Sequence, residues 1–211
     1  MMMKAREILG LSKIIPVITI EDVSLSVDLA KALMDGGAKV LEITLRTKEA
    51  LKAIESISKE LPELVVGAGT ILNAHQLELA IKAGAKFGIS PGLNTIFATA
   101  LKKFNLPFIP GIASAGELML ALEFGFDTLK FFPAQAAGGV NMLKSFSGPF
   151  KDIKFCPTGG ISIDNMKEYL KLDNVICIGG SWLTPKELVL RKEWQKISQL
   201  TSQSLKLTKN L

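Results

Sequence analysis

The sequence predicts an α/β fold of the (β/α)8 TIM barrel class, with residues 1–211 in a single domain that includes a short N-terminal helix. Short apolar segments rich in β-branched residues alternate with amphipathic segments, and the apolar segments begin about 20–26 residues apart. No linker rich in Pro, Gly or Ser divides the chain. An open doubly wound sheet is the alternative, but it usually carries G-x-G-x-x-G after its first strand, and IIPVITIED from Ile14 has none.

Eight apolar segments are the expected strands. In chain order they read IIPVITI, VLEITL, VVGAGTI, FGIS, PFIPGIA, TLKFFPA, KFCPTGG and VICIGGS, and they begin at Ile14, Val40, Val65, Phe87, Pro107, Thr128, Lys154 and Val175. The stretches between them, such as VSLSVDLAKALMDGG and NAHQLELAIKAG, carry apolar residues at i, i+3, i+4 and i+7, as one face of a helix does. Several end in Gly, which helix C-termini favour. Because catalytic groups of such barrels lie at the carboxyl ends of strands, polar residues in these segments are the first candidates.

The composition excludes several classes of protein. Hydrophobic residues make up 48% of the chain, which excludes disorder, and no apolar run reaches the roughly 18 residues of a membrane span. The net charge is +5, but the sequence has no basic stripe interleaved with aromatic residues, so we expect no nucleic-acid and no membrane partner. Two Cys and no signal-peptide pattern indicate a cytoplasmic protein, in which Cys156 and Cys177 are small core residues. The single His75 and the lack of a ligand cluster predict no metal and no cofactor.

Lys130 is the most informative residue of the chain. It lies inside TLKFFPA, beside Leu129 and Phe131, on a strand that we expect to be buried on both faces. Burial favours the neutral amine, which is the form that attacks a carbonyl carbon and gives a Schiff base. The alternative interpretation is a lysine that reaches solvent or is held in a structural ion pair.

Glu42 and Arg46 provide partners for this lysine. They lie in LEITLRT and, with Thr44, share one face if the second strand runs through them. Should that face be the barrel interior, Glu42 is placed to act as a general acid and base, and Arg46 to bind a substrate carboxylate. A buried Glu–Arg pair with a purely structural role is the alternative.

Three expected strands end in glycine-rich sequences. They are GAGT from Gly67, PTGG from Pro157 and IGGS from Ile178. Consecutive backbone N–H groups at such ends bind phosphate without a charged side chain, and barrels of this class often place phosphate after strands seven and eight. Tight turns alone also explain glycines, so the paired occurrence at the last two strands is the stronger indication.

Together these segments resemble the KHG/KDPG aldolases. The resemblance rests on LEITLRT, VGAGT, SPG, PGI, LKFFPA, GPF, FCPTGGIS and CIGGSWL, which follow in order from about Ile14 to Trp182. It implies a cofactor-independent class I aldolase that acts on 2-keto-3-deoxy-6-phosphogluconate (KDPG) and 4-hydroxy-2-oxoglutarate, and it also implies a homotrimer. The galactonate-specific relatives lack LRT after the catalytic Glu, so the gluconate-type substrate is favoured.

The resemblance also assigns roles to residues. It implies that Lys130 forms the Schiff base and that Glu42 moves protons. It further implies that Arg46 and Thr70 hold the substrate carboxylate and that Pro91 and Phe132 form the walls of the pyruvate pocket. The polar and phosphate end of the substrate would be bound by residues of the last two strand ends, Thr158, Gly159, Gly160, Gly179, Gly180 and Ser181. One departure from the family pattern is Gln135, where PAEANGG reads PAQAAGG.

Two other functions remain open at this level. A phosphosugar epimerase or isomerase on the same barrel uses similar glycine turns but has no need of a buried lysine in the sixth strand. A non-catalytic protein that binds a phosphorylated metabolite is the second alternative, and turnover of KDPG distinguishes it from an enzyme.

Overall fold

The computed structural model describes residues 3–209 and contains the expected alternation of strands and helices. The strands are β1 (Ile14–Ile18), β2 (Val40–Thr44), β3 (Val65–Gly69), β4 (Gly88–Ile89), β5 (Phe108–Ile109), β6 (Gly111–Ile112), β7 (Thr128–Phe131), β8 (Lys154–Pro157) and β9 (Ile178–Gly180). The α-helices are α1 (Ala5–Leu9), α2 (Ser26–Asp35), α3 (Ala50–Glu60), α4 (Ala74–Lys82), α5 (Thr95–Leu101), α6 (Ala115–Glu123), α7 (Gly139–Ser147), α8 (Met166–Leu170), α9 (Lys186–Leu190) and α10 (Trp194–Lys206).

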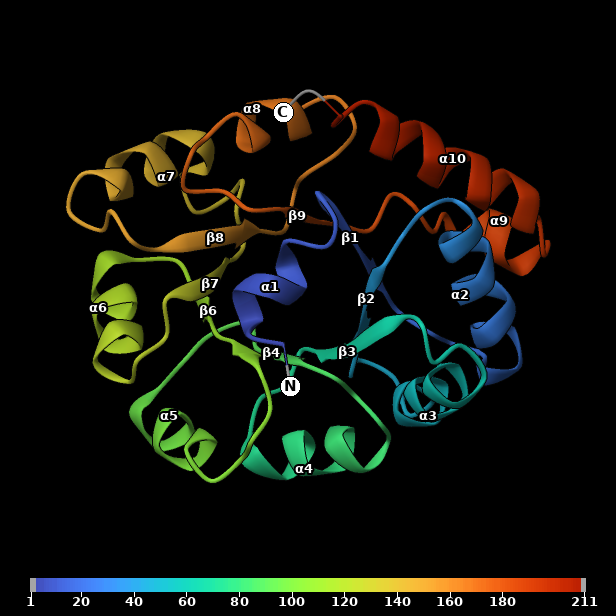
Figure 1. Cartoon of the computed structure of the whole chain (residues 1–211), viewed down its shortest axis with the longest axis horizontal. Coiled ribbons are helices and arrows are strands. Elements are labelled where there is room, and N and C mark those ends of the chain that lie inside the picture. The colour runs from blue at the N-terminus through green and yellow to red at the C-terminus, as the bar shows by residue number, and fades with distance from the viewer. Residues whose placement is uncertain (1–2, 210–211) are drawn as a thin grey trace.

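The strands form two parallel sheets. One has six strands in the order β5-β4-β3-β2-β1-β9, and the other has three in the order β6-β7-β8. Figure 1 shows the strands around the middle of the molecule, with helices outside them and α1 lying over the middle. The α/β class with parallel strands is confirmed, whereas closure into one eight-stranded barrel stays a prediction.

Each of the eight predicted strand segments contains a strand, but the fifth is divided. Pro110 separates β5 from β6, because proline has no N–H to continue the ladder. Its carbonyl is still used, since it accepts a hydrogen bond of 2.9 Å from the backbone N–H of Lys130. Between β8 and the β9 segment there are two isolated bridges, Phe155 with Val175 and Thr158 with Gly179.

Local signals in the sequence explain where the helices begin and end. The side chain of Asn73 accepts from the backbone N–H of Gln76 at the start of α4, which satisfies one of the free donors there. The predicted glycine ends are confirmed at Gly37, Gly84 and Gly125, which all have positive φ angles.

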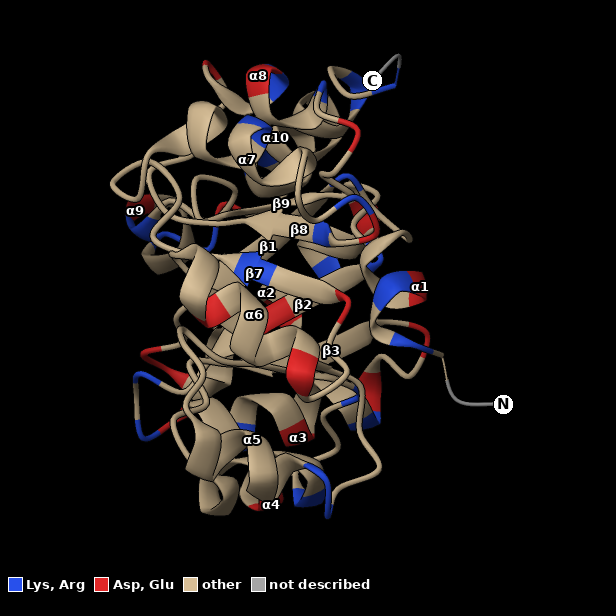
Figure 2. Cartoon of the chain, turned by 90° about the vertical axis from the view of Figure 1, so that its left-hand side faces the viewer, with Lys and Arg blue, Asp and Glu red and all other residues tan. Residues whose placement is uncertain are grey.

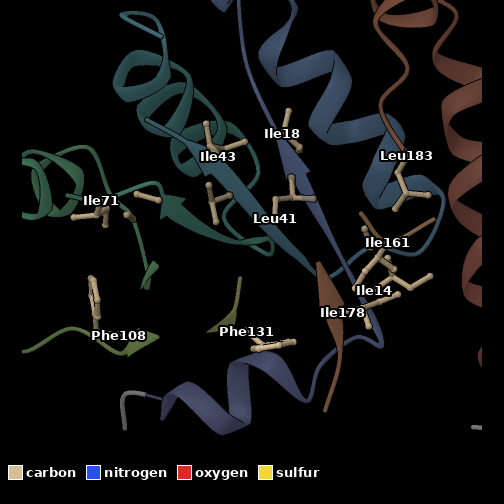
Figure 3. Packing of buried hydrophobic residues seen from close by; sticks show 14 of the residues in the cluster. Ile14, Ile18, Leu41, Ile43, Ile71, Phe108, Phe131, Ile161, Ile178 and Leu183 are labelled. Atoms are coloured by element: carbon tan, nitrogen blue, oxygen red, sulfur yellow. The ribbon is translucent and has the colours of Figure 1, made fainter. Parts of the chain in front are cut away.

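Two hydrophobic clusters hold the fold together. The larger packs the outer faces of the strands against the helices, and Figure 3 shows Ile18 of β1 and Ile43 of β2 within it. The smaller is formed by the opposite faces of the strands together with α1, whose Ile8 and Leu9 are fully buried. Its members are Ile8, Leu9, Ile15, Val40, Val65, Phe87, Ile89, Ile109, Cys156 and Cys177. Helix α1 therefore closes the amino end of the space between the strands, and the interpretation of both Cys as free, buried core residues is confirmed.

The surface carries charges of both signs. Figure 2 shows basic and acidic residues interspersed over the helices and loops that face the viewer. His75 is exposed, as its position at the start of α4 predicts. Among residues 3–209, no helix is long and apolar enough to cross a membrane.

The buried position of α1 generates a prediction about stability. Replacing Leu9 with Ala should lower the free energy of unfolding by about 2–5 kcal/mol, because it leaves a cavity under the smaller cluster. Leu190→Ala, at a side chain that is 61% exposed, should change it by about 0.5 kcal/mol or less. Urea unfolding of both variants measures the difference, and equal losses would show that α1 does not close the core.

Candidate active site

Lys130 and Glu42 form a buried ion pair between β7 and β2. Lys130 Nζ donates to Glu42 Oε1 at 2.9 Å, and the two side chains are only 5% and 1% exposed. All four residues of β7 are buried, as predicted. In Figure 2 the basic part of β7 and the acidic part of β2 lie inside the molecule rather than on its surface. An amine and a carboxylate are thus in direct contact and buried away from water.

Small residues on β3 make room for Glu42. In the parallel register, Glu42 lies beside Gly67 and Thr44 beside Gly69. A Cβ atom at Gly69 would overlap the Glu42 carboxylate, and one at Gly67 would overlap the ring of Phe87. Close packing therefore accounts for the glycines of GAGT, and their interpretation as a phosphate-binding strand end stays a prediction.

Arg46 does not lie on the same strand as Glu42. Strand β2 ends at Thr44, and Arg46 follows in an exposed turn, so the expectation that it shares the strand face is wrong. The N–H of Leu45 still donates to the carbonyl of Gly69 at 2.8 Å, and the chain turns directly after this bond. The hydroxyl of Thr44 donates to the carbonyl of Ile18 at 3.0 Å and lies 3.0 Å from the hydroxyl of Thr19. Within residues 3–209 the Arg46 guanidinium makes no ion pair.

Thr70 directly follows β3 in an unusual backbone conformation. Its φ angle is +58°, which is strained for a β-branched residue and occurs mainly where the surroundings enforce it. The side chain is half-buried at the carboxyl end of the strand. Thr70 lies one residue beyond Gly69, the register neighbour of Thr44, and its role in the site stays a prediction.

Two predicted wall residues lie near Lys130. The ring of Phe132 has its centroid 5.4 Å from Lys130 Nζ, close enough for a cation–π contact. Gly111 is the register neighbour of Lys130, and a Cβ on Gly111 would overlap the backbone of Pro91. Phe132 therefore lies beside the amine, whereas Pro91 packs against Gly111, the register neighbour of Lys130; both are half-buried.

The turn after β8 presents free backbone donors. Gly159 and Gly160 have φ angles of +100° and +74°, and the carbonyls of Thr158, Gly159 and Gly160 all accept hydrogen bonds. The respective donors are Ala134 N at 2.8 Å, Gln135 N at 3.0 Å and Asn165 Nδ2 at 3.0 Å. Within residues 3–209 the N–H groups of Gly160 and Ile161 donate to no acceptor. Such a turn suits an anion, because its carbonyls are held elsewhere and its donors are free.

The end of β9 lies next to this turn. Thr158 bridges to Gly179, and a side chain at Gly179 would overlap the Thr158 hydroxyl. Gly180 has a different packing constraint, because a Cβ atom at this position would overlap the ring of Trp182. Ser181 follows in an exposed position.

A pocket of about 200 Å³ opens beside Ser181. It is lined by Val17 and Thr19 at the end of β1 and by Lys186 of α9, whose ammonium pairs with Glu21 at 2.8 Å. Val17 is the register neighbour of Glu42 and approaches Gly179, so the pocket adjoins the space that holds the ion pair. Sequence reasoning missed these lining residues, because an apolar strand residue and surface charges carry no distinguishing signal.

The two cysteines lie between the strands, in the smaller hydrophobic cluster that α1 closes. Cys156 is the register neighbour of Lys130, and burial raises the pKa of the Cys177 thiol well above its usual value, with the neighbouring Cys156 adding to the effect. Cys177 is therefore protonated and uncharged beneath the ion pair. Among residues 3–209 no cluster of three or more His, Cys, Asp or Glu side chains could hold a metal ion.

Comparison with known proteins matches this geometry to a family. The family model for KDPG and KHG aldolase matches residues 5–200. The 2-dehydro-3-deoxy-phosphogluconate aldolase of Pseudoalteromonas atlantica is 48% identical over 95% of this chain and 94% of its own. Among solved structures, the KDPG aldolase of Legionella pneumophila, with pyruvate captured as a covalent carbinolamine, superposes with a TM-score of 0.94 at 44% identity, covering 96% of this chain and 98% of that one.

A second solved structure contains a phosphorylated ligand. The 2-keto-3-deoxy-6-phosphogluconate aldolase of Zymomonas mobilis with 3-phosphoglycerate has a TM-score of 0.90 at 40% identity, covering 97% of this chain and 96% of that one. The chain belongs to the KDPG and KHG aldolase family.

Proposed function

We propose that this protein is a class I aldolase that cleaves KDPG to pyruvate and glyceraldehyde 3-phosphate through a Schiff base on Lys130. The observation that carries the proposal is the buried contact of 2.9 Å between Lys130 Nζ and the Glu42 carboxylate. The same chemistry splits 4-hydroxy-2-oxoglutarate into pyruvate and glyoxylate. Membership of an aldolase family favours this reaction over an epimerase, an isomerase or a non-catalytic binding protein.

In the first half of the reaction Glu42 moves protons for Lys130. The carboxylate takes a proton from the ammonium, and the neutral amine attacks the C2 ketone to give a carbinolamine. Protons returned through Glu42 to the former ketone oxygen allow water to leave, which produces a cationic imine and restores the Glu42 carboxylate. The Legionella relative with pyruvate captured as a carbinolamine supports this order of events.

In the second half the imine accepts electrons. Glu42 removes the C4 hydroxyl proton, the C3–C4 bond breaks, and its electron pair forms an enamine while glyceraldehyde 3-phosphate leaves. The protonated Glu42 then returns its proton to C3, and hydrolysis of the resulting imine releases pyruvate and Lys130. One carboxylate thus serves every proton transfer, which requires that it reach both the nitrogen and the substrate carbons.

The remaining residues position the substrate. We assign Arg46 and Thr70 to the carboxylate beside the ketone, because a guanidinium binds a carboxylate through two parallel hydrogen bonds. The exposed Arg46 must then fold inward over the substrate. Pro91 and Phe132 form the walls that exclude water from the imine.

The phosphate end lies at the turns after β8 and β9. The free N–H groups near Gly160 and the hydroxyl of Ser181 are suited to a phosphate dianion. Their common neighbourhood is built by Thr158, Gly159, Gly160, Gly179, Gly180 and Ser181. The Zymomonas relative with 3-phosphoglycerate supports a phosphorylated ligand in this family.

We extend the proposal to the architecture. The two sheets form one closed eight-stranded barrel in a single domain, supported by the two bridges from β8 to the β9 segment and by the single residue between β5 and β6. A homotrimer is proposed from the family resemblance, and light scattering tests it. A cytoplasmic location fits the two free thiols.

Turnover of KDPG by variants of Lys130 tests the function. The parent should produce pyruvate in an assay coupled to lactate dehydrogenase, and Lys130→Met should abolish it. Loss of Lys130 alone leaves a buried carboxylate unpaired, at about 3–5 kcal/mol, so the double variant Lys130→Met/Glu42→Gln is measured beside it. Lys144→Met, on α7, is the control and should retain activity. Cleavage by a folded Lys130→Met protein would contradict the proposal.

Exchange of pyruvate methyl protons tests the role of Glu42. Glu42→Gln should slow exchange by about 10²–10⁴-fold, because the positioned proton acceptor is removed. Gly69→Ala should also slow it, since the added methyl displaces the Glu42 carboxylate. Gly116→Ala, where a Cβ meets nothing within 4 Å, is the control. Exchange at the parent rate in Glu42→Gln would reassign the proton shuttle.

Ser181→Ala tests the phosphate end without adding bulk. Loss of one hydrogen bond to a charged group should lower kcat/KM for KDPG by about tenfold or more. Pyruvate proton exchange has no phosphate to bind and should keep its rate. Ser147→Ala, at an exposed residue of α7, controls for loss of a hydroxyl. An equal effect on exchange and cleavage would place Ser181 outside the phosphate site.

A further inference from the structure

A side-chain hydrogen bond lies directly behind the turn that follows β8. The hydroxyl of Tyr169, on α8, donates to Gln135 Oε1 at 2.7 Å. Tyr169 is 1% exposed, whereas Gln135 lies at the surface in the segment between β7 and α7. The pair therefore ties a fixed point in the core to a loop that is otherwise open to solvent.

Gln135 is in contact with the turn itself. Its backbone N–H donates to the carbonyl of Gly159 at 3.0 Å, and its Cβ lies only 2.5 Å from where a Cβ on Gly160 would stand. Gly160 has a φ of +74°. Because glycine has no Cβ, it can adopt many other backbone conformations, and only its neighbours exclude them. The side chain of Gln135 is the nearest of those neighbours.

Tyr169 reaches the adjoining loop as well. Its hydroxyl lies 3.2 Å from where a Cβ on Gly139 would stand, at the start of α7. Burial raises the pKa of Tyr169, with Glu168 contributing less, so the hydroxyl keeps its proton and acts as a donor across the working pH range. Gly139 also donates its N–H to the carbonyl of Ala134 at 2.9 Å, which fixes the loop beside Gln135.

We propose that the Tyr169–Gln135 hydrogen bond is a brace that holds Gly160 so that its free N–H faces the substrate phosphate. Tyr169 and Gln135 are positioning residues, which act through the turn and not on the reacting atoms. The proposal rests on the phosphate site assigned above and adds what fixes its geometry. Without the brace, Gln135 is tied to the turn only through its backbone hydrogen bond to Gly159, its side chain is free to move, and the turn samples conformations in which its donors diverge.

Matched variants separate the hydrogen bond from side-chain size. Tyr169→Phe keeps the buried ring and removes the donor, and Gln135→Met keeps the length of the chain and removes the acceptor. Each should raise KM for KDPG about fivefold with a smaller change in kcat, and should weaken competitive inhibition by inorganic phosphate by the same factor. Because both remove one and the same hydrogen bond, the double variant should be no worse than either single one.

Three controls complete the experiment. Gln135→Glu retains an acceptor and should restore KM to near the parent value. Thr201→Val removes a buried hydroxyl of α10, which donates to the Ile197 carbonyl, and should leave KM unchanged even if the melting temperature falls. Pyruvate proton exchange should be unaffected in all of these proteins.

The outcomes distinguish the brace from the function on which it rests. A parent protein that neither cleaves KDPG nor binds inorganic phosphate would refute the proposed function. An active parent whose KM and phosphate inhibition are unchanged in Tyr169→Phe would refute the brace, and so would effects of the two single variants that multiply in the double variant.

Discussion

The buried ion pair between Lys130 and Glu42 is the interaction on which the rest of the site depends. Two opposite charges lie 2.9 Å apart and almost fully out of water, where neither is stable without the other. An ion pair of the same length on the surface would be screened by water and would contribute little to stability. Here the pairing keeps a proton donor and acceptor in contact, and the family's chemistry requires that this proton leave the amine at the start of each turnover.

The surroundings are built to accommodate that pair. Gly69 leaves space for the carboxylate, the uncharged Cys177 lies below, and α1 closes the amino end with Leu9. Above the pair the strands end in turns, where Gly160 and its neighbours expose backbone donors instead of side-chain cations. Charge is therefore concentrated at one buried point, whereas the turns above it, to which we assign the substrate phosphate, offer neutral N–H groups.

The sequence predicted most of the fold and that Lys130 and Glu42 face one another, because charged residues inside apolar strands are rare enough to be informative. Lys130 and Glu42 were recognisable for that reason. The position of Arg46 was predicted wrongly, since the end of a strand depends on pairing with its neighbours, and the chain turns directly after Leu45 makes its hydrogen bond to β3. The pocket beside Val17 follows from contacts between distant segments that no local pattern records. The division of the fifth strand, by contrast, has a local cause in Pro110, which the prediction of one continuous strand did not take into account.

Reduction with borohydride in the presence of pyruvate, followed by peptide mass mapping, tests the central claim most directly. If Lys130 is the nucleophile, the reduced imine adds a carboxyethyl group to the peptide that contains Lys130 and to no other. The label should require pyruvate and should disappear in Lys130→Met. A label on Lys144 or Lys154, or no label while the protein turns over KDPG, would contradict the account.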